Sequence, residues 1–157
     1  MSGRLPVHLD PLSLAERGRV IEGSVPIAAF KRLAPSLHRD RGDIAVTLRF
    51  ERDTGGRHVL HGELDGQLEL VCQRCLTPFA LPIGRTFDVV LVESLAAADL
   101  LPEELEPLVV DERRSMHTVD LLEDELILAL PIVPRCGDGG PGCETAVEVL
   151  ASEDLGG

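Results

Sequence analysis

The residues with the clearest chemistry in this 157-residue chain are its four cysteines, Cys72 and Cys75 and, far downstream, Cys136 and Cys143. Two thiolates separated by two residues can hold one side of a metal ion, because the short turn between them directs both sulfurs the same way. A second pair would complete the tetrahedral coordination that zinc prefers. The spacing therefore predicts a structural zinc site with these four ligands, which would tie the middle of the chain to its end.

The downstream pair is the weaker signal, because the loop 136–143 separates its cysteines by more than the usual two to four residues. The glycines of that loop give its backbone the freedom to wrap around an ion. Arg74 and Arg135 each adjoin a cysteine and would offset the negative charge of four thiolates. Two alternatives stay open: four thiols partly buried in the core, or a redox pair, which the lack of a surrounding βαβ pattern disfavours.

A hairpin is expected to present the first cysteine pair. Residues 44–52 alternate apolar and polar side chains, as a half-buried strand does, and the sequence Asp-Thr-Gly-Gly at 53–56 favours a tight turn. Residues 57–71 and 81–94 extend as strands on the two sides of the cysteine turn. A hairpin with cysteines at its tip is half of a ribbon-type zinc site.

The clearest helix is predicted over residues 120–130. Asp120 is expected to cap it, with Glu123 as the third-residue partner, and Pro131 to end it. Leucines recur at four-residue intervals on one face, and Ile127 and Ala129 are expected to widen that face toward the core. Weaker patterns predict an arm or strand over 7–14, a strand over 19–26, a short helix over 27–33, a loop or frayed helix over 95–106, a short strand over 108–110 and a last short helix over 145–155.

These elements predict an α+β fold, an antiparallel β-rich single domain over residues 1–157 with a few short helices and a ribbon-like zinc site. An acidic, flexible segment is expected over residues 95–118. With 44% hydrophobic residues the chain can bury one core. No apolar run approaches the roughly 20 residues of a membrane span, and the N-terminus lacks the apolar region of a signal peptide. We expect a cytoplasmic protein, where thiols stay reduced.

The net charge of −12 is unevenly distributed. Residues 1–75 carry 11 basic and 10 acidic side chains, whereas residues 76–157 carry 4 basic and 17 acidic ones. The acidic part repels phosphates and suits a basic protein partner. Without Trp or Tyr, the stacking surfaces of single-strand RNA binders are hard to build. Basic residues that could contact phosphates lie in the N-terminal half. The basic segment 31–41 contains Lys31, Arg32, His38, Arg39 and Arg41, although a solvated helix end and loop is its favoured interpretation. The strand arginines that could add to an RNA contact are Arg49, Arg52 and Arg57.

Two other groups of residues invite a catalytic or metal role, and neither is favoured. His58 and His61 are three residues apart on a predicted strand, which places them on opposite faces. The acids at 123–125 have no partner base or nucleophile nearby in the sequence, so a solvated acidic helix face is expected. No catalytic residue is predicted, and the chain is not expected to be an enzyme.

Three motifs, in order along the chain, are familiar: Leu9-Asp-Pro, Cys72-Gln-Arg-Cys-Leu, and the tract from Val119 to Pro134 that reads Val-Asp-Leu-Leu-Glu-Asp-Glu-Leu-Ile-Leu-Ala-Leu-Pro-Ile-Val-Pro. Together they resemble the YceD family, the bacterial large ribosomal RNA subunit accumulation proteins, over about residues 7–144. The resemblance implies a non-enzymatic factor for synthesis, processing or stability of large-subunit (23S) ribosomal RNA, docking on a basic protein or on the pre-ribosomal large subunit.

The resemblance bears on the predicted metal site as well. Family members can carry a histidine where Cys136 stands, followed by a cysteine that matches Cys143, and that exchange keeps a zinc ligand. The chain lacks the longer basic tail of some relatives, which puts a contact between such a tail and RNA in doubt. Two alternative functions remain: a zinc-stabilised module that binds RNA through the arginine-rich N-terminal half, and a thiol redox protein.

Overall fold

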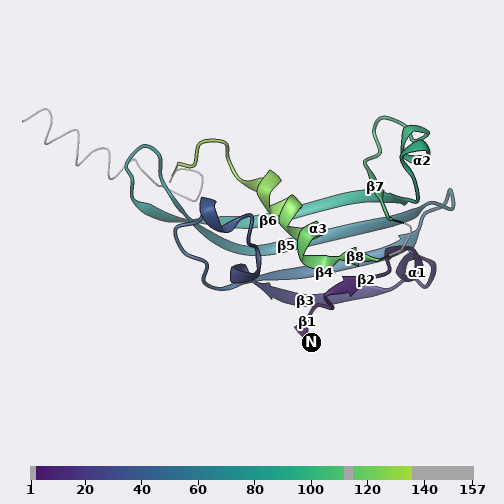
Figure 1. The fold of residues 1–157 in the computed structure, drawn as a ribbon, viewed down its shortest axis with the longest axis horizontal. Helices are drawn as coiled ribbons and strands as arrows, with labels where there is room; N and C mark the ends of the chain where they lie inside the picture. Colours follow the sequence, from purple (N-terminus) through teal and green to yellow (C-terminus); the bar gives the residue numbers. More distant parts are fainter. Residues whose placement is uncertain (1–2, 112–114, 136–157) are drawn as a thin grey trace, which may run out of the picture.

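The computed structural model describes residues 3–111 and 115–135. In this part of the chain a curled, mostly antiparallel sheet is combined with a few short helices (Figure 1), which confirms the predicted α+β class. The strands of this sheet are, in spatial order, β1 (Gly3–Arg4), β3 (Val20–Pro26), β4 (Asp43–Arg52), β5 (His58–Val71), β6 (Pro78–Val92) and β7 (Pro107–Val109).

The central strands β3, β4, β5 and β6 pair antiparallel in sequence order, while β1 and β7 add in parallel at the two edges. The alternation predicted for β4 is confirmed, because Ile44, Val46, Leu48 and Phe50 are all buried. In the turn that follows, Asp53 accepts hydrogen bonds from two backbone N–H groups. The bond from the N–H of Arg57 is the main cause that lowers the pKa of Asp53.

The N-terminal segment differs from the predicted arm or strand. It forms β2 (His8–Leu9), which pairs with β8 (Met116–His117), and then α1 (Pro11–Glu16). Asp10 caps α1 by accepting the N–H of Ser13 at 3.1 Å, and proline occupies the first helical position, where its missing N–H costs nothing. Pro11 therefore starts a helix within the stretch expected to be an arm or strand.

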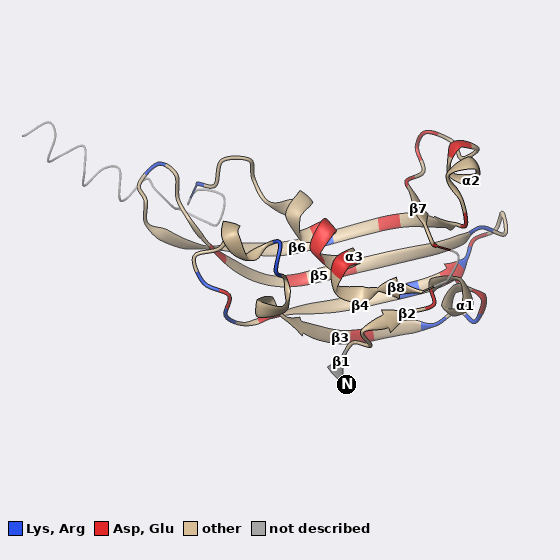
Figure 2. Cartoon of the chain, in the orientation of Figure 1, with Lys and Arg blue, Asp and Glu red and all other residues tan. Residues whose placement is uncertain are grey.

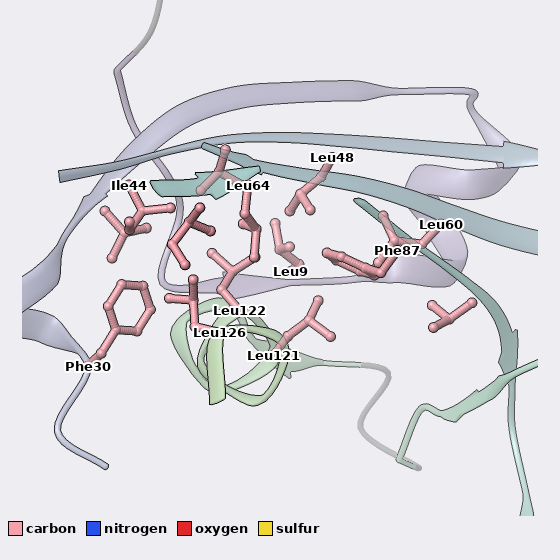
Figure 3. Close-up of a cluster of buried hydrophobic side chains, with 14 of the residues drawn as sticks. Leu9, Phe30, Ile44, Leu48, Leu60, Leu64, Phe87, Leu121, Leu122 and Leu126 are labelled. Atoms are coloured by element: carbon pink, nitrogen blue, oxygen red, sulfur yellow. The ribbon is translucent and has the colours of Figure 1, made fainter. Parts of the chain in front are cut away.

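The helix α3 (Thr118–Ala129) lies across one face of the sheet and closes the core (Figures 1 and 3). Figure 3 shows Leu121, Leu122 and Leu126 pointing into a cluster formed with side chains of the strands, and all three are buried. The predicted stripe is wrong at Ile127, whose side chain is 38% exposed. The predicted cap is also wrong: the N-cap residue is His117, and Asp120 lies in the first turn.

Short helical segments flank the sheet. The predicted helix 27–33 is replaced by the 3-10 turns η1 (Ile27–Ala29) and η2 (Ala34–Ser36). The stretch 95–118 contains α2 (Leu95–Asp99) followed by β7 and β8. The leucines and alanines of residues 97–105 pack on the face of the sheet opposite to α3, which we call the outer face. No helix in the described residues is long and apolar enough to cross a membrane. The predicted helix 145–155 lies outside the described residues.

Candidate metal-binding knuckle

The first cysteine pair sits at the end of the hairpin formed by β5 and β6, in a turn that we call the knuckle (residues 72–77). The ladder between the strands continues one step into it, because the N–H of Cys72 donates to the carbonyl of Thr77 at 3.0 Å. The N–H of Leu76 then donates to the carbonyl of Cys72 at 2.8 Å. Leu76 has a φ of 61°, a left-handed conformation that is costly for a leucine. Because the two strands are paired up to this point, the chain reverses within a tight turn, and Cys72 and Cys75 lie close together.

Two backbone N–H groups of the knuckle point at one sulfur. The N–H of Arg74 lies 3.3 Å and that of Cys75 lies 3.4 Å from Sγ of Cys72. Cys72 is buried, Cys75 is half-buried, and Phe79 packs against them. Peptide N–H groups aimed at a sulfur stabilise its anionic form, and a thiolate is the form that binds a metal. The described half of the predicted site therefore fits a metal ligand pair.

The end of the described chain reaches the knuckle. After α3, residues 130–135 run back toward the hairpin tip (Figure 1), where the N–H of Gln73 donates to the carbonyl of Pro134 at 2.8 Å. A hollow at this contact is lined by Gln73, Arg74, Val133 and Arg135, so both arginines predicted to offset thiolate charge lie beside the cysteine turn. The chain is therefore fastened to the knuckle at Pro134, two residues before Cys136.

The downstream ligands themselves, Cys136 and Cys143, lie outside the described residues. Across 3–111 and 115–135, no group of three or more cysteine, histidine or acidic residues has the arrangement to hold a metal ion. The zinc site with four sulfur ligands therefore stays a prediction. The structure places Cys72 and Cys75 together, as the spacing required.

The basic segment considered for phosphate contact is partly neutralised within the chain. Nε of Arg32 lies 2.9 Å from Glu123 and Nη1 lies 2.8 Å from Asp124. The hydrogen bond to Asp124, and after it the one to Glu123, raises the pKa of Arg32 above its ordinary value. Nε of Arg39 lies 3.9 Å from Glu69. Two of the cations in this segment are thus engaged with acids, which reduces its value as a phosphate site.

The acids of α3 correct the sequence analysis. Glu123 and Glu125 were expected on a solvated face, but they are only 2% and 6% exposed, respectively. Glu123 accepts the N–H groups of Arg32 at 2.7 Å and Leu33 at 3.0 Å, and Glu125 lies 3.0 Å from Nε of Arg85. The prediction was wrong because both partners are distant in the sequence. Asp124, in contrast, is exposed as expected.

The outer face of the sheet carries a cluster that sequence patterns did not single out. Nδ1 of His61 bonds to Asp88, and Nε2 lies 2.9 Å from Glu51. The hydrogen bond to Asp88 is the main cause that raises the pKa of His61 above its ordinary value. His58 and His61 lie on opposite faces, as the strand spacing predicted. Only the pairing of strands could place these three residues side by side.

The fold and the knuckle together define the class of the protein: a sheet-based domain with a two-cysteine turn at the tip of its longest hairpin. Comparison with known proteins gives the family. Residues 60–155 match the model of the YceD family, described as large ribosomal RNA subunit accumulation protein. The chain is also 35% identical, over 131 residues, to a curated protein of that name from Haemophilus influenzae, covering 83% of the chain and 75% of the relative. The chain belongs to the YceD family.

No solved structure matches the chain. The resemblance inferred from the three motifs is confirmed by these comparisons, and the matched residues include the whole knuckle and both downstream cysteines.

Proposed function

We propose that this protein is a non-enzymatic factor that supports the accumulation of large-subunit (23S) ribosomal RNA in the cytoplasm. The observation that carries the proposal is its membership of the YceD family, with similarity over most of the chain. The proposed mode of action is docking on a basic protein partner or on the pre-ribosomal large subunit. Such docking would protect or present the RNA during synthesis or processing.

The charge of the surface favours a basic protein over bare RNA as the direct partner. The outer face of the sheet carries the exposed carboxylates of Glu63, Asp65 and Asp88, and the chain as a whole has a net charge of −12. Like charges repel, so a phosphate backbone would approach this face at a cost. A positively charged segment of a protein would be attracted to it.

The knuckle is proposed as half of a structural zinc site completed by Cys136 and Cys143. The support is the pair of N–H groups aimed at Sγ of Cys72, and the hydrogen bond that brings the chain before Cys136 to the knuckle. Bound zinc would supply only coordination, linking two segments that are distant in sequence. Arg74 and Arg135 would offset the negative charge of the thiolates.

Depletion of the protein in its native host tests the proposed function. The measurement is the ratio of mature large-subunit to small-subunit ribosomal RNA, with recovery by the wild-type gene as the control. A fall in this ratio that the wild-type gene reverses is expected. An unchanged ratio in cells that have lost the protein would contradict the proposal.

A further inference from the structure

Within residues 3–111 and 115–135, the outer edge of β6 is open over most of its length. Strand β7 pairs only with Val90, Leu91 and Val92, whereas β6 begins at Pro78. Figure 1 shows β6 along one margin of the sheet, with β7 beside only one of its ends. Among the described residues, none pairs its backbone with the outer edge between Pro78 and Val89. A long edge strand of this kind is a template for another strand.

The direction of the backbone groups on this edge follows from one hydrogen bond. The N–H of Val90 donates outward, to the carbonyl of Glu106 at 2.8 Å. Pairing of β6 with β5 runs without a bulge from Pro78 to Leu91, so every second residue points its backbone groups the same way as Val90. The residues that present outward groups are Ala80, Pro82, Gly84, Thr86 and Asp88.

The residues of the edge leave it accessible. Pro82 has no N–H, and it occupies an outward position where no bond to β5 is lost. Ala80 and Thr86 have small side chains, Gly84 has none, and all three residues are exposed. Natural edge strands are usually protected by charges, bulges or covering segments. Among the residues with outward backbone groups, Pro82 and Asp88 are the two protective ones, and only the small residues Gly84 and Thr86 lie between them.

Each face beside the edge selects a different kind of side chain. On the inner face, a hollow of about 470 Å³ is lined by residues 81–86 of β6 and by Leu128 and Ala129 of α3. Its lining is mixed: Leu128, which is 64% exposed, offers an apolar contact, and the guanidinium of Arg85 lies beside it with its charge offset by Glu125 at 3.0 Å. Because side chains of a strand alternate, a strand added to β6 would direct every second residue to this side.

On the outer face the neighbouring groups are acidic. Glu63 and Asp65 of β5 pair with Thr86 and Gly84 of β6, and both acids are exposed. Oδ1 of Asp65 lies 3.8 Å from the position that a Cβ of Gly84 would occupy, so the carboxylate leans over the glycine toward the edge. Figure 2 shows acidic residues on β5 and β6. A lysine or arginine on an added strand could reach these carboxylates across the small side chains of β6.

We propose that the open edge of β6 binds an extended segment of a basic protein by strand addition. Its backbone would pair with the outward groups around Gly84, its lysines or arginines would meet Asp65 and Glu63, and its apolar side chains would face Leu128. The inference rests on the proposed function, because it identifies the chemistry of the basic partner and the surface that receives it. Backbone pairing supplies affinity in this mode of recognition, and alternate side chains supply specificity.

Binding of a labelled ten-residue peptide of alternating lysine and valine to the full chain tests the proposal by fluorescence anisotropy. Thr86→Pro removes one outward N–H, and Thr86→Ala is its matched control because it keeps that group. We expect the proline variant to bind about tenfold more weakly, since the peptide carbonyl loses its donor. Equal affinity of the two variants would overturn the proposal.

Two further arms keep the test decisive if the proline variant does not fold. A peptide methylated on alternate backbone nitrogens should lose binding to the wild-type chain, and the unmethylated peptide should slow hydrogen exchange at Gly84 and Thr86. Asp65→Lys should weaken binding, whereas Glu22→Lys, on the distant strand β3, should not. Binding that is indifferent to methylation, or displacement of the peptide from this edge by an RNA oligonucleotide, would overturn the proposal.

The outcome is separable from that of the proposed function. If depletion lowers large-subunit RNA and the Thr86→Pro gene restores it fully, the edge is not the docking surface and the function stands. If the peptide binds as expected but depletion has no effect on the RNA, strand addition stands and the RNA role falls.

Discussion

Replacing Glu123 with alanine tests whether one buried carboxylate fastens the segment before η2 to α3. The side chain of Glu123 is 3% exposed, and its Oε2 accepts the N–H groups of both Arg32, at 2.7 Å, and Leu33, at 3.0 Å. Leu33 is itself fully buried in the native fold, so its N–H depends on this carboxylate for an acceptor. The variant therefore leaves a buried donor without an acceptor.

The expected loss follows from the number of bonds removed. A hydrogen bond to a charged group contributes about 1.5–3 kcal/mol, and the two backbone donors lose theirs together. The guanidinium of Arg32 adds little, since its side chain is 51% exposed and water replaces the lost partner. We expect the free energy of unfolding to fall by about 3 kcal/mol, a large part of the stability of an ordinary domain.

Urea unfolding followed by circular dichroism measures this loss, with Asp124→Ala as the matched control. Asp124 pairs with the same Arg32 at 2.8 Å but is 61% exposed, so its removal should leave the unfolding midpoint close to that of the wild type. Equal midpoints for the two alanine variants would refute the role assigned to burial. Amide exchange at Leu33 should accelerate in the Glu123 variant alone.

Three further predictions concern stability and protonation. Gly62→Ala should destabilise the protein by about 3 kcal/mol, because the added Cβ would lie 2.2 Å from the ring of Phe87. Gly84→Ala is the control, since its added Cβ would meet only Asp65, at 3.8 Å. Equal unfolding midpoints for the two variants would contradict this prediction. Leu76→Gly should stabilise the knuckle by about 1 kcal/mol, since φ is 61° there, and Leu76→Ala should not; a destabilised glycine variant would count against the strain. The pKa of His61, measured by NMR titration, should lie above the ordinary value of about 6.5 and fall in Asp88→Asn. Since the folded pKa is raised, the stability from this contact is fully present below about pH 6.5 and is lost as the pH rises through the folded value, so Asp88→Asn should matter at low pH and little at high pH.

The strands and the knuckle could be predicted because their signals are local. Alternation over β4 and β5 fixes which side chains face the core, and the Asp-Thr-Gly-Gly turn between them supplies its own capping bonds from Asp53. The spacing of Cys72 and Cys75 requires only one turn between paired strands. Each of these features is decided within a few residues of sequence.

The features that were missed depend on contacts distant in the sequence, with one exception. Glu123 takes the N–H groups of Arg32 and Leu33, which a helix over 27–33 would have used internally, and so explains why that helix does not form. The start of α3 at Thr118 is set by the bond of its hydroxyl to the carbonyl of Pro6 at 2.6 Å. The exception is α1, whose capping aspartate and first-position proline were visible in the sequence.

The most direct test of the account is the metal content of the intact protein, purified without chelator and without added zinc, by native mass spectrometry. The account predicts one zinc ion per chain, lost in Cys72→Ser and in Cys136→Ser but kept in Thr77→Ser, which leaves all four cysteines in place. X-ray absorption should then show sulfur ligands alone at about 2.3 Å. A wild-type protein that carries no metal and takes up none when zinc is supplied would contradict the account.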